Sequence, residues 1–201
     1  MGNKPYQPLP PYAVPLDGQS VEAGQTPVYK TSDPRRDAAL LSGNGKTLQD
    51  ALRVRFQSDA DQQRFCWRRT DPQTGALTRD VVWMTNREFQ ERAEALGSSL
   101  LWMNLCPEVK EYRNLNLRFL GFYAKHTINY LIADTACLLY GITTAPIYDT
   151  LGEEATAFAF RQTGMTTCLV DCKHVSGLLD ARKKDPSYKA LKTIIVSDPE
   201  N

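Results

Sequence analysis

The sequence predicts an α/β fold in which a mainly parallel sheet is flanked by helices. Strand-like and helix-like segments alternate from Leu115 to Ser197, and the helical patterns are roughly ten to fifteen residues long. Gly141 and Gly164 each follow such a pattern directly, where glycine takes the left-handed conformation that ends a helix. Right-handed crossovers of this kind place neighbouring strands parallel, so we expect an open, mainly parallel sheet with flanking helices.

The composition is that of an ordinary folded protein, with 201 residues of which 42% are hydrophobic. The 24 Lys and Arg residues nearly balance 23 Asp and Glu residues, which argues against a nucleic-acid-binding protein. Five scattered cysteines indicate reduced thiols of an intracellular protein rather than a disulfide framework. Cys168, Cys172 and His174 lack the four-ligand pattern of structural zinc, so no metal site is predicted.

Residues 1–32 are predicted to form a proline-rich extended arm, followed by an α/β domain over 33–201. Five prolines lie between Pro5 and Pro15, which favours polyproline geometry. The Pro8–Pro11 spacing fits a ligand of an SH3 or WW module, and an arm lying over its own domain is the alternative that we favour. The chain begins like an N-myristoylation signal, but Tyr6 replaces the preferred Ser or Thr, so acylation of Gly2 stays open.

The first elements of the domain are a capped helix, a hairpin and a long helix. Ser42–Thr47 resembles the end of a phosphate-binding loop, but Leu40 stands where that loop needs glycine. Thr47 is instead expected to cap a helix whose apolar face includes Leu48, Ala51, Leu52 and Phe56. Strands are predicted at 65–68 and 77–84. A capping box at Thr85–Glu88 then begins a helix that Pro107 closes, with Phe89, Ala93, Leu96, Leu100 and Met103 on its buried face.

The remaining elements form the parallel sheet and its crossovers. Strands are predicted at 115–123, 142–148, 166–171 and 192–197, and helices at 128–140, 153–163 and 175–184. Ligands of such sheets collect at the carboxyl ends of the strands, where Tyr148–Gly152 would lie. Asp149 could act there as a base or metal ligand and Tyr148 as a hydrogen-bond donor. The alternative that we favour is that Asp149 and Thr150 cap the following helix.

The segment Pro146-Ile147-Tyr148-Asp149-Thr150-Leu151-Gly152 resembles the Pro-Leu-Tyr-Asp-Thr-Leu-Gly signature of long-chain acyl-CoA synthetases, in the adenylate-forming (AMP-binding) superfamily. The segments Trp83–Phe89, Gly121–Asp134, Ala136–Gly141 and Gly152–Asp171 resemble the family pattern around it. The resemblance extends over about Asp33–Asn201 and implies a partial N-terminal AMP-binding-type α/β domain over 33–201. His126–Tyr130 departs from the family's Asn-Arg-Pro-Glu-Trp. We expect a structural role for the signature residues Pro146, Tyr148, Asp149, Thr150, Leu151 and Gly152.

The resemblance implies the N-terminal portion of an ATP-dependent long-chain fatty acid–CoA ligase. Such enzymes join a fatty carboxylate to AMP and then transfer the acyl group to CoA, with ATP, Mg²⁺ and CoA required by the complete enzyme. The family's Pro-Lys-Gly loop and Tyr-Gly-x-Thr-Glu element do not occur in this sequence. No catalytic residue, metal ligand, substrate-binding residue or cofactor is therefore assigned within the chain, which we expect to be inactive alone.

Two alternatives stay open besides an enzyme fragment. A short non-catalytic protein could use the same scaffold to bind acyl-CoA or a protein. An independent flavodoxin-like domain would need a phosphate-binding turn after its first strand, and Leu120–Thr127 has one glycine and bulky aromatics there. No apolar run is long enough to cross a bilayer, so we expect an intracellular protein, cytoplasmic or peripheral on an organelle membrane.

Overall fold

The computed structural model describes residues 13–18, 22–32, 47–71, 73–110, 115–148 and 150–197. The chain divides into two compact units, Met1–Val54 and Arg55–Asn201. In the first unit, β1 (Ala13–Pro15) pairs antiparallel with β2 (Tyr29–Thr31), an arrangement that the predicted extended arm did not include. Three predicted features lie outside the described residues: Gly2, the proline motif at 8–11 and the glycine-rich segment 42–46. The predicted domain boundary at 32/33 lies at the edge of a described range.

The helix α2 (Leu48–Ser58) begins where its cap was predicted. The Thr47 hydroxyl accepts the Asp50 N–H at 3.2 Å, and the Asp50 carboxylate accepts the Thr47 N–H in return at 3.2 Å. Of the four residues expected on its apolar face, only Phe56 is buried, and Leu48 is 61% exposed. The cap therefore follows from local sequence, whereas burial depends on tertiary packing.

A hairpin and a long helix come next in the second unit. The antiparallel strands β3 (Gln63–Thr70) and β4 (Leu77–Thr85) lead directly into α3 (Asn86–Trp102), which has the predicted capping box of Thr85 and Glu88. The Phe65 ring stacks on Phe89 with centroids 3.9 Å apart, which fixes the hairpin to the helix. The expectation that Met103 lies on the buried face is wrong: the helix ends one residue earlier, and Met103 is 57% exposed.

The remaining elements form a five-stranded sheet with three flanking helices. They are β5 (Glu108–Lys110), β6 (Asn116–Tyr123), α4 (Ile128–Tyr140), β7 (Thr143–Pro146), α5 (Gly152–Thr163), β8 (Thr167–Asp171), α6 (Cys172–Lys184), the 3₁₀ helix η2 (Pro186–Tyr188) and β9 (Thr193–Ser197). Gly141 and Gly164 end α4 and α5 with φ values of 65° and 59°, as predicted. The short strand β5 was not predicted.

The sheet confirms the predicted α/β class and its parallel arrangement. Four strands run parallel in the order β7-β6-β8-β9, and β5 is antiparallel to the start of β6. Because Gly121 pairs with Ala145 of β7 and with Cys168 of β8, these two strands lie on opposite edges of β6. After β6, the chain adds β7 at one edge of that strand and then returns to add β8 and β9 at the other. The direction in which successive strands are added therefore reverses between β6 and β8.

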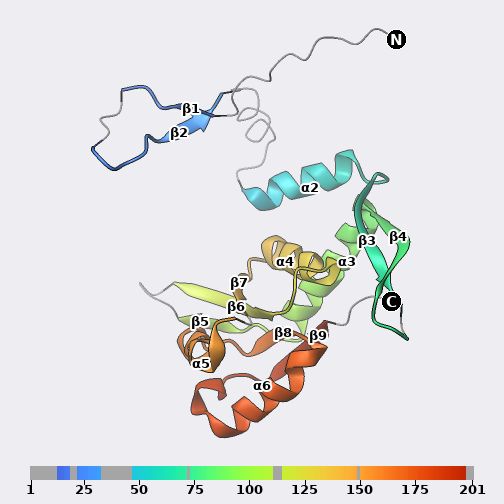
Figure 1. Ribbon diagram of the computed structural model, residues 1–201, viewed down its shortest axis with the longest axis vertical. Coiled ribbons are helices and arrows are strands. Elements are labelled where there is room, and N and C mark those ends of the chain that lie inside the picture. The colour runs from blue at the N-terminus through green and yellow to red at the C-terminus, as the bar shows by residue number, and fades with distance from the viewer. Residues whose placement is uncertain are drawn as a thin grey trace. The chain divides into compact units, whose positions relative to one another are not determined.

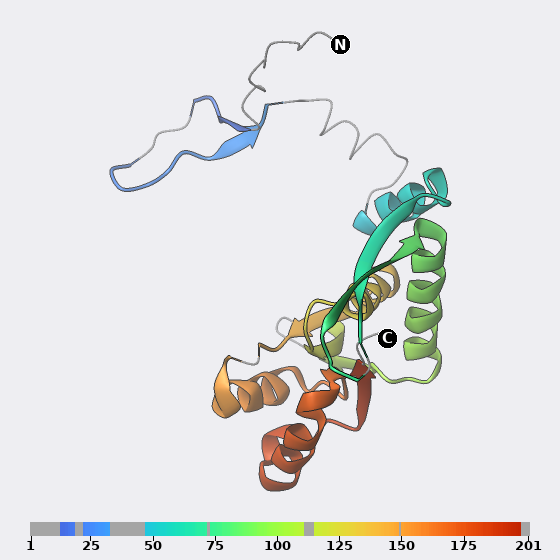
Figure 2. The ribbon, with the colours of Figure 1, turned by 45° about the vertical axis from the view of Figure 1, so that its right-hand side comes forward.

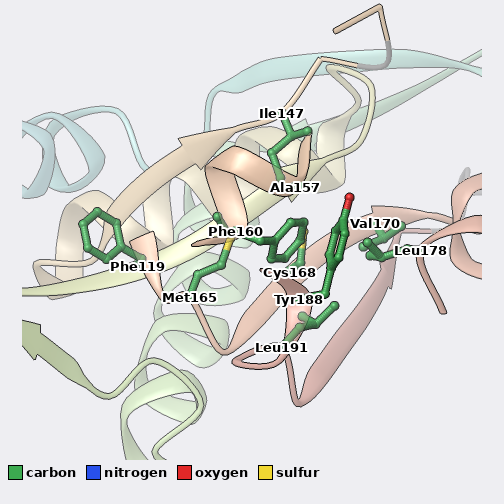
Figure 3. Close-up of a cluster of buried hydrophobic side chains, with 10 residues drawn as sticks. All are labelled: Phe119, Ile147, Ala157, Phe160, Met165, Cys168, Val170, Leu178, Tyr188 and Leu191. Carbon is green, nitrogen blue, oxygen red and sulfur yellow. The ribbon is translucent and has the colours of Figure 1, made fainter. Parts of the chain in front are cut away.

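Helices cover both faces of this sheet, with α3 and α4 on one side and α5 and α6 on the other (Figures 1 and 2). Alternate residues of β6 point to opposite cores: Phe119 contributes to the α5/α6 side, and Leu120 and Phe122 to the α3/α4 side. Figure 3 shows the α5/α6 core, where Phe160, Val170 and Leu178 surround the ring of Tyr188. Both faces of β8 are buried, which is why Cys168, Leu169 and Val170 form an apolar run rather than an alternating pattern.

Candidate functional site

A cavity lies at the carboxyl ends of three neighbouring parallel strands, beside the point where the strand order reverses. The connection after β6 runs to β7 on one side and that after β8 runs to β9 on the other, and open α/β sheets bind ligands at such a position. The cavity has a volume of about 180 Å³. We call it the rim pocket; it is lined by Phe122, Tyr123, Ala124, Lys125, His126, Tyr130, Pro146, Ile147, Tyr148, Asp171 and His174.

One wall of the rim pocket is the start of the Pro146–Gly152 segment. The Ile147 N–H donates to the Phe122 carbonyl at 2.8 Å, and the Tyr148 carbonyl accepts the Leu151 N–H at 3.1 Å. The backbone thus leaves the sheet in a turn, and Gly152 enters α5 with φ at 78°, a left-handed value that favours glycine. The Tyr148 side chain is 57% exposed and lines the pocket.

The structure corrects the cap expected for α5. Its N-cap residue is Leu151, and no side chain makes a capping hydrogen bond there. Thr150 therefore lies one residue too early for that role. Asp149 falls outside the described residues, so its role as cap, base or ligand stays a prediction.

A second wall comes from the junction of β8 and α6. The helix begins directly at Cys172, three residues before the predicted start, and Asp171 is its N-cap residue without a side-chain capping bond. The Asp171 carboxylate instead accepts the backbone N–H of Lys125 at 3.1 Å. This bond joins the ends of β6 and β8 across the point of strand reversal and fixes the segment that carries Lys125 and His126.

Both histidines of the chain line the rim pocket. The His174 ring stacks on Tyr123 with centroids 4.4 Å apart and an interplanar angle of 17°. The His126 ring lies 4.4 Å from that of Tyr130, tilted by 50°. Each histidine stands three residues after the last residue of a strand, His126 after β6 and His174 after β8. The rim pocket is therefore lined by aromatic rings that pack against one another in pairs.

The electrostatic character of the rim pocket combines cationic and neutral donors with one carboxylate. Lys125 and the two imidazoles provide positive or donor groups, and Asp171 provides an acceptor. Burial raises the pKa of Tyr130, with a smaller contribution from the charge of Asp134, so the phenol stays a hydrogen-bond donor at neutral pH. Burial also raises the pKa of Asp134, and the proximity of His126 acts in the opposite direction.

Sequence reasoning placed Pro146 and Tyr148 at this edge, and it missed Lys125, His126 and His174 as a group. These three belong to two segments that meet only through the strand order. A usable signal was present, because the only two histidines each follow a predicted strand by a few residues. His174 was instead considered with Cys168 and Cys172, but Cys168 is buried in the core and Cys172 is exposed.

Two further properties bear on the chemistry of the site. Over the ranges that the structure describes, no three His, Cys, Asp or Glu side chains are grouped as metal ligands would be. None of the described helices combines the length and apolar character needed to cross a bilayer.

Comparison with known proteins identifies a matching family and similar sequences. The model of the AMP-binding enzyme family matches residues 65–201. Long-chain-fatty-acid–CoA ligase 5 of Mus musculus is 31% identical over 117 residues, and ligase 6 of Homo sapiens is 32% identical over 117 residues. Each match covers 58% of this chain and 16% of the relative, so the chain spans about a sixth of the length of these ligases.

A solved structure with the same fold is the adenylation domain of a carboxylate reductase from Mycobacterium chelonae. The TM-score is 0.63 at 17% sequence identity, and the match covers 82% of this chain and 25% of that chain. At this identity the likeness establishes the fold, in agreement with the predicted adenylate-forming architecture.

Proposed function

The chain belongs to the AMP-binding enzyme family, and we propose that it forms the N-terminal part of an ATP-dependent long-chain fatty acid–CoA ligase. The observation that carries the proposal is the match over 65–201, together with long-chain-fatty-acid–CoA ligases as relatives. In the complete enzyme, a fatty carboxylate attacks the α-phosphorus of Mg-ATP and releases pyrophosphate. The CoA thiol then displaces AMP and forms the acyl thioester.

The rim pocket is proposed to hold the adenosine phosphate portion of a substrate, a group that ATP and CoA share. At about 180 Å³ the cavity is smaller than the roughly 300–1,000 Å³ of a pocket that encloses a whole ligand. The cavity therefore suits the adenosine phosphate portion of a nucleotide better than a complete acyl-CoA. The position at the strand reversal is also where nucleotides bind in other open α/β sheets.

The lining supplies the contacts that such a group needs. The stacked pair of His174 and Tyr123 offers a flat face for an adenine ring, and base–aromatic stacking stabilises binding by about 1–3 kcal/mol. Lys125 and His126 are exposed at the mouth and suit phosphate oxygens. The Asp171 carboxylate is an acceptor that suits ribose hydroxyls.

The phosphoryl chemistry itself is assigned to elements other than the rim pocket. Charge on the α-phosphorus must be stabilised by lysine, Mg²⁺ and backbone N–H groups. The family's Pro-Lys-Gly loop is not among the 201 residues, so the proposed role of this chain is to position substrate.

Calorimetric titration of the chain with CoA, ATP and flavin mononucleotide tests this role. We expect saturable binding of CoA or ATP, and the stronger of the two identifies the source of the adenosine group. His174→Ala should weaken the binding of that nucleotide at least tenfold because the stacking face is lost. Cys172→Ser, an exposed neighbour outside the pocket, is the control. Tighter binding of the flavin, or no binding of either adenine nucleotide, would overturn the proposed pocket.

A further inference from the structure

A cluster of positive charge lies at the end of α6 and in the turn that follows it, where β9 begins. Over residues 180–192 the chain places five of its 24 Lys and Arg residues but only two of its 23 Asp and Glu residues. All five side chains are exposed. We call them the basic patch: Arg182, Lys183, Lys184, Lys189 and Lys192. Because α6 starts at the rim and runs back across the sheet, the patch lies at the end of the helix remote from the rim pocket.

Four of the five residues of the basic patch line a hollow rather than a flat surface. A cavity of about 280 Å³ is lined by Arg182, Lys183, Lys184, Asp185, Pro186 and Lys189. The Arg182 Nε atom donates to the Leu191 carbonyl at 2.8 Å, which ties the end of α6 to the segment before β9. The geometry of the hollow is thereby fixed by the fold.

The two carboxylates of this segment offset only part of this charge. Asp185 accepts the backbone N–H of Ser187 at 2.8 Å and serves as the cap of η2. Asp180 pairs with Lys183 at 3.1 Å, but both side chains are largely exposed, and such pairs contribute little. The five basic residues of segment 180–192 still outnumber its two carboxylates, which leaves the segment with a net positive charge.

Interaction with the dipole of α6 explains the positions of only some of the basic residues. Arg182, Lys183 and Lys184 lie in the last turn of α6, where cations are favoured. Lys189 and Lys192 lie beyond the helix, and that effect falls off within one turn. Lys189 nevertheless lines the hollow, which points to an external anion.

An apolar side chain lies beside the patch. Leu179 is 44% exposed on α6, and its spacing of three and four residues from Arg182 and Lys183 places it on the same face. A half-exposed leucine among cations suits a bilayer surface, where the apolar group enters the interface and the cations contact anionic headgroups. A nucleic acid would use the cations but not the leucine.

From these features we infer that the basic patch and Leu179 dock the protein on an anionic lipid bilayer, with a headgroup phosphate in the hollow. The choice of a lipid surface also rests on the proposed function, since a long-chain fatty acid dissolves in bilayers. Docking at this site would keep the protein near such a substrate and leave the rim pocket clear of the membrane.

Sedimentation of the whole chain with vesicles tests the inference without ATP, CoA or fatty acid, so that its outcome is separate from that of ligase activity. We expect binding to vesicles of three parts phosphatidylcholine and one part phosphatidylserine, weakened by salt, and little binding to phosphatidylcholine alone. Each lysine neutralised in the patch should weaken binding about fivefold. The triple variant Lys183→Gln/Lys184→Gln/Lys189→Gln should therefore lose on the order of 100-fold.

A matched variant separates the patch from total charge. Arg69→Gln/Arg79→Gln/Lys110→Gln removes the same charge from exposed positions of β3, β4 and β5 and should leave binding within about twofold of the native chain. Leu179→Ser should weaken binding, whereas Leu115→Ser, at another exposed leucine, should not. Thermal unfolding of every variant verifies that it is folded.

Equal losses in the two triple variants would overturn the inference, as would equal binding to neutral and anionic vesicles. Duplex DNA that binds more tightly than the anionic vesicles, through the same lysines, would assign the patch to a nucleic acid instead.

Discussion

The backbone N–H of Lys125 donates to the carboxylate of Asp171 at 3.1 Å, although the two residues are 46 positions apart in the sequence. Lys125 follows β6 and Asp171 ends β8, so the bond spans the two strands between which the order of the sheet reverses. It joins the two segments that carry His126 and His174, both of which line the rim pocket. The integrity of the pocket should therefore depend on this one acceptor.

Replacement of Asp171 tests that dependence. Asp171→Ala removes the acceptor of the Lys125 N–H and should cost about 1 kcal/mol in the free energy of unfolding and weaken nucleotide binding. Asp171→Asn keeps an acceptor oxygen and should retain most of the stability. Urea unfolding and CoA titration measure the two effects. Equal losses in both variants would show that the carboxylate acts through its charge rather than as the acceptor for Lys125.

The contact of α3 with α4 depends on a glycine. A Cβ atom added at Gly97 would fall within the ring of Tyr140, so Gly97→Ala should destabilise the chain by about 1–3 kcal/mol through overpacking. Gly177 in α6 has no neighbour within 4 Å of such an atom, and Gly177→Ala should stabilise by about 0.5–1 kcal/mol. Thermal unfolding measures both changes. The helix packing would be contradicted if the two substitutions had the same sign.

The start of α3 should contribute stability that depends on pH. The Glu88 carboxylate accepts the N–H of Thr85 at 2.8 Å and its hydroxyl at 2.9 Å, and these bonds lower the pKa of Glu88 from its usual 4.5. Because the folded pKa lies below the unfolded one, this contribution is complete above pH 4.5 and is lost as pH falls through the lowered value.

Glu88→Gln should therefore reduce stability at pH 7 and flatten its decline in acid, and Thr85→Ala should cost about 1 kcal/mol. Glu91→Gln, an exposed carboxylate on the same helix, is the control. Urea unfolding at several pH values gives the comparison. A native-like acid decline in Glu88→Gln would contradict the capping box.

Of the five cysteine thiols, three are buried and two are exposed. Burial raises the pKa of Cys106 to about 11 and that of Cys168 to about 12, and burial likewise raises the pKa of Cys137. Buried, protonated thiols react slowly, so a disulfide reagent at pH 8 should modify two cysteines, Cys66 and Cys172, in the folded chain and all five in urea. Rapid modification of three or more under native conditions would contradict the described core.

The sequence predicted those parts of the fold that local chemistry determines. Gly141 and Gly164 marked the ends of their helices because a left-handed residue is needed there, and Thr85 with Glu88 marked the start of α3. The end of α3 was misplaced because Asn104, with φ at 50°, takes the left-handed conformation well before Pro107. The strand β5 was missed because three residues carry no periodic signal, and only its pairing with β6 defines it.

The rim pocket was harder to predict than the fold. Tyr148 was expected at the carboxyl edge because it follows a strand directly. Lys125 and His174 could be joined to it only by the order β7-β6-β8, which depends on tertiary packing rather than on local sequence. Thr150 does not cap α5 because the helix begins at Gly152, one residue before the predicted start, and its N-cap residue is Leu151.

The central claim is that this chain is the substrate-positioning N-terminal part of a long-chain fatty acid–CoA ligase. Acyl-CoA formation by the protein encoded in the complete reading frame that contains these 201 residues tests it most directly. With palmitate, ATP, Mg²⁺ and CoA, we expect palmitoyl-CoA, AMP and pyrophosphate in equal amounts, and His174→Ala should raise the KM for ATP or CoA at least tenfold while that for palmitate is kept. A folded protein that forms no palmitoyl-CoA, or that cleaves ATP to ADP, would contradict the claim.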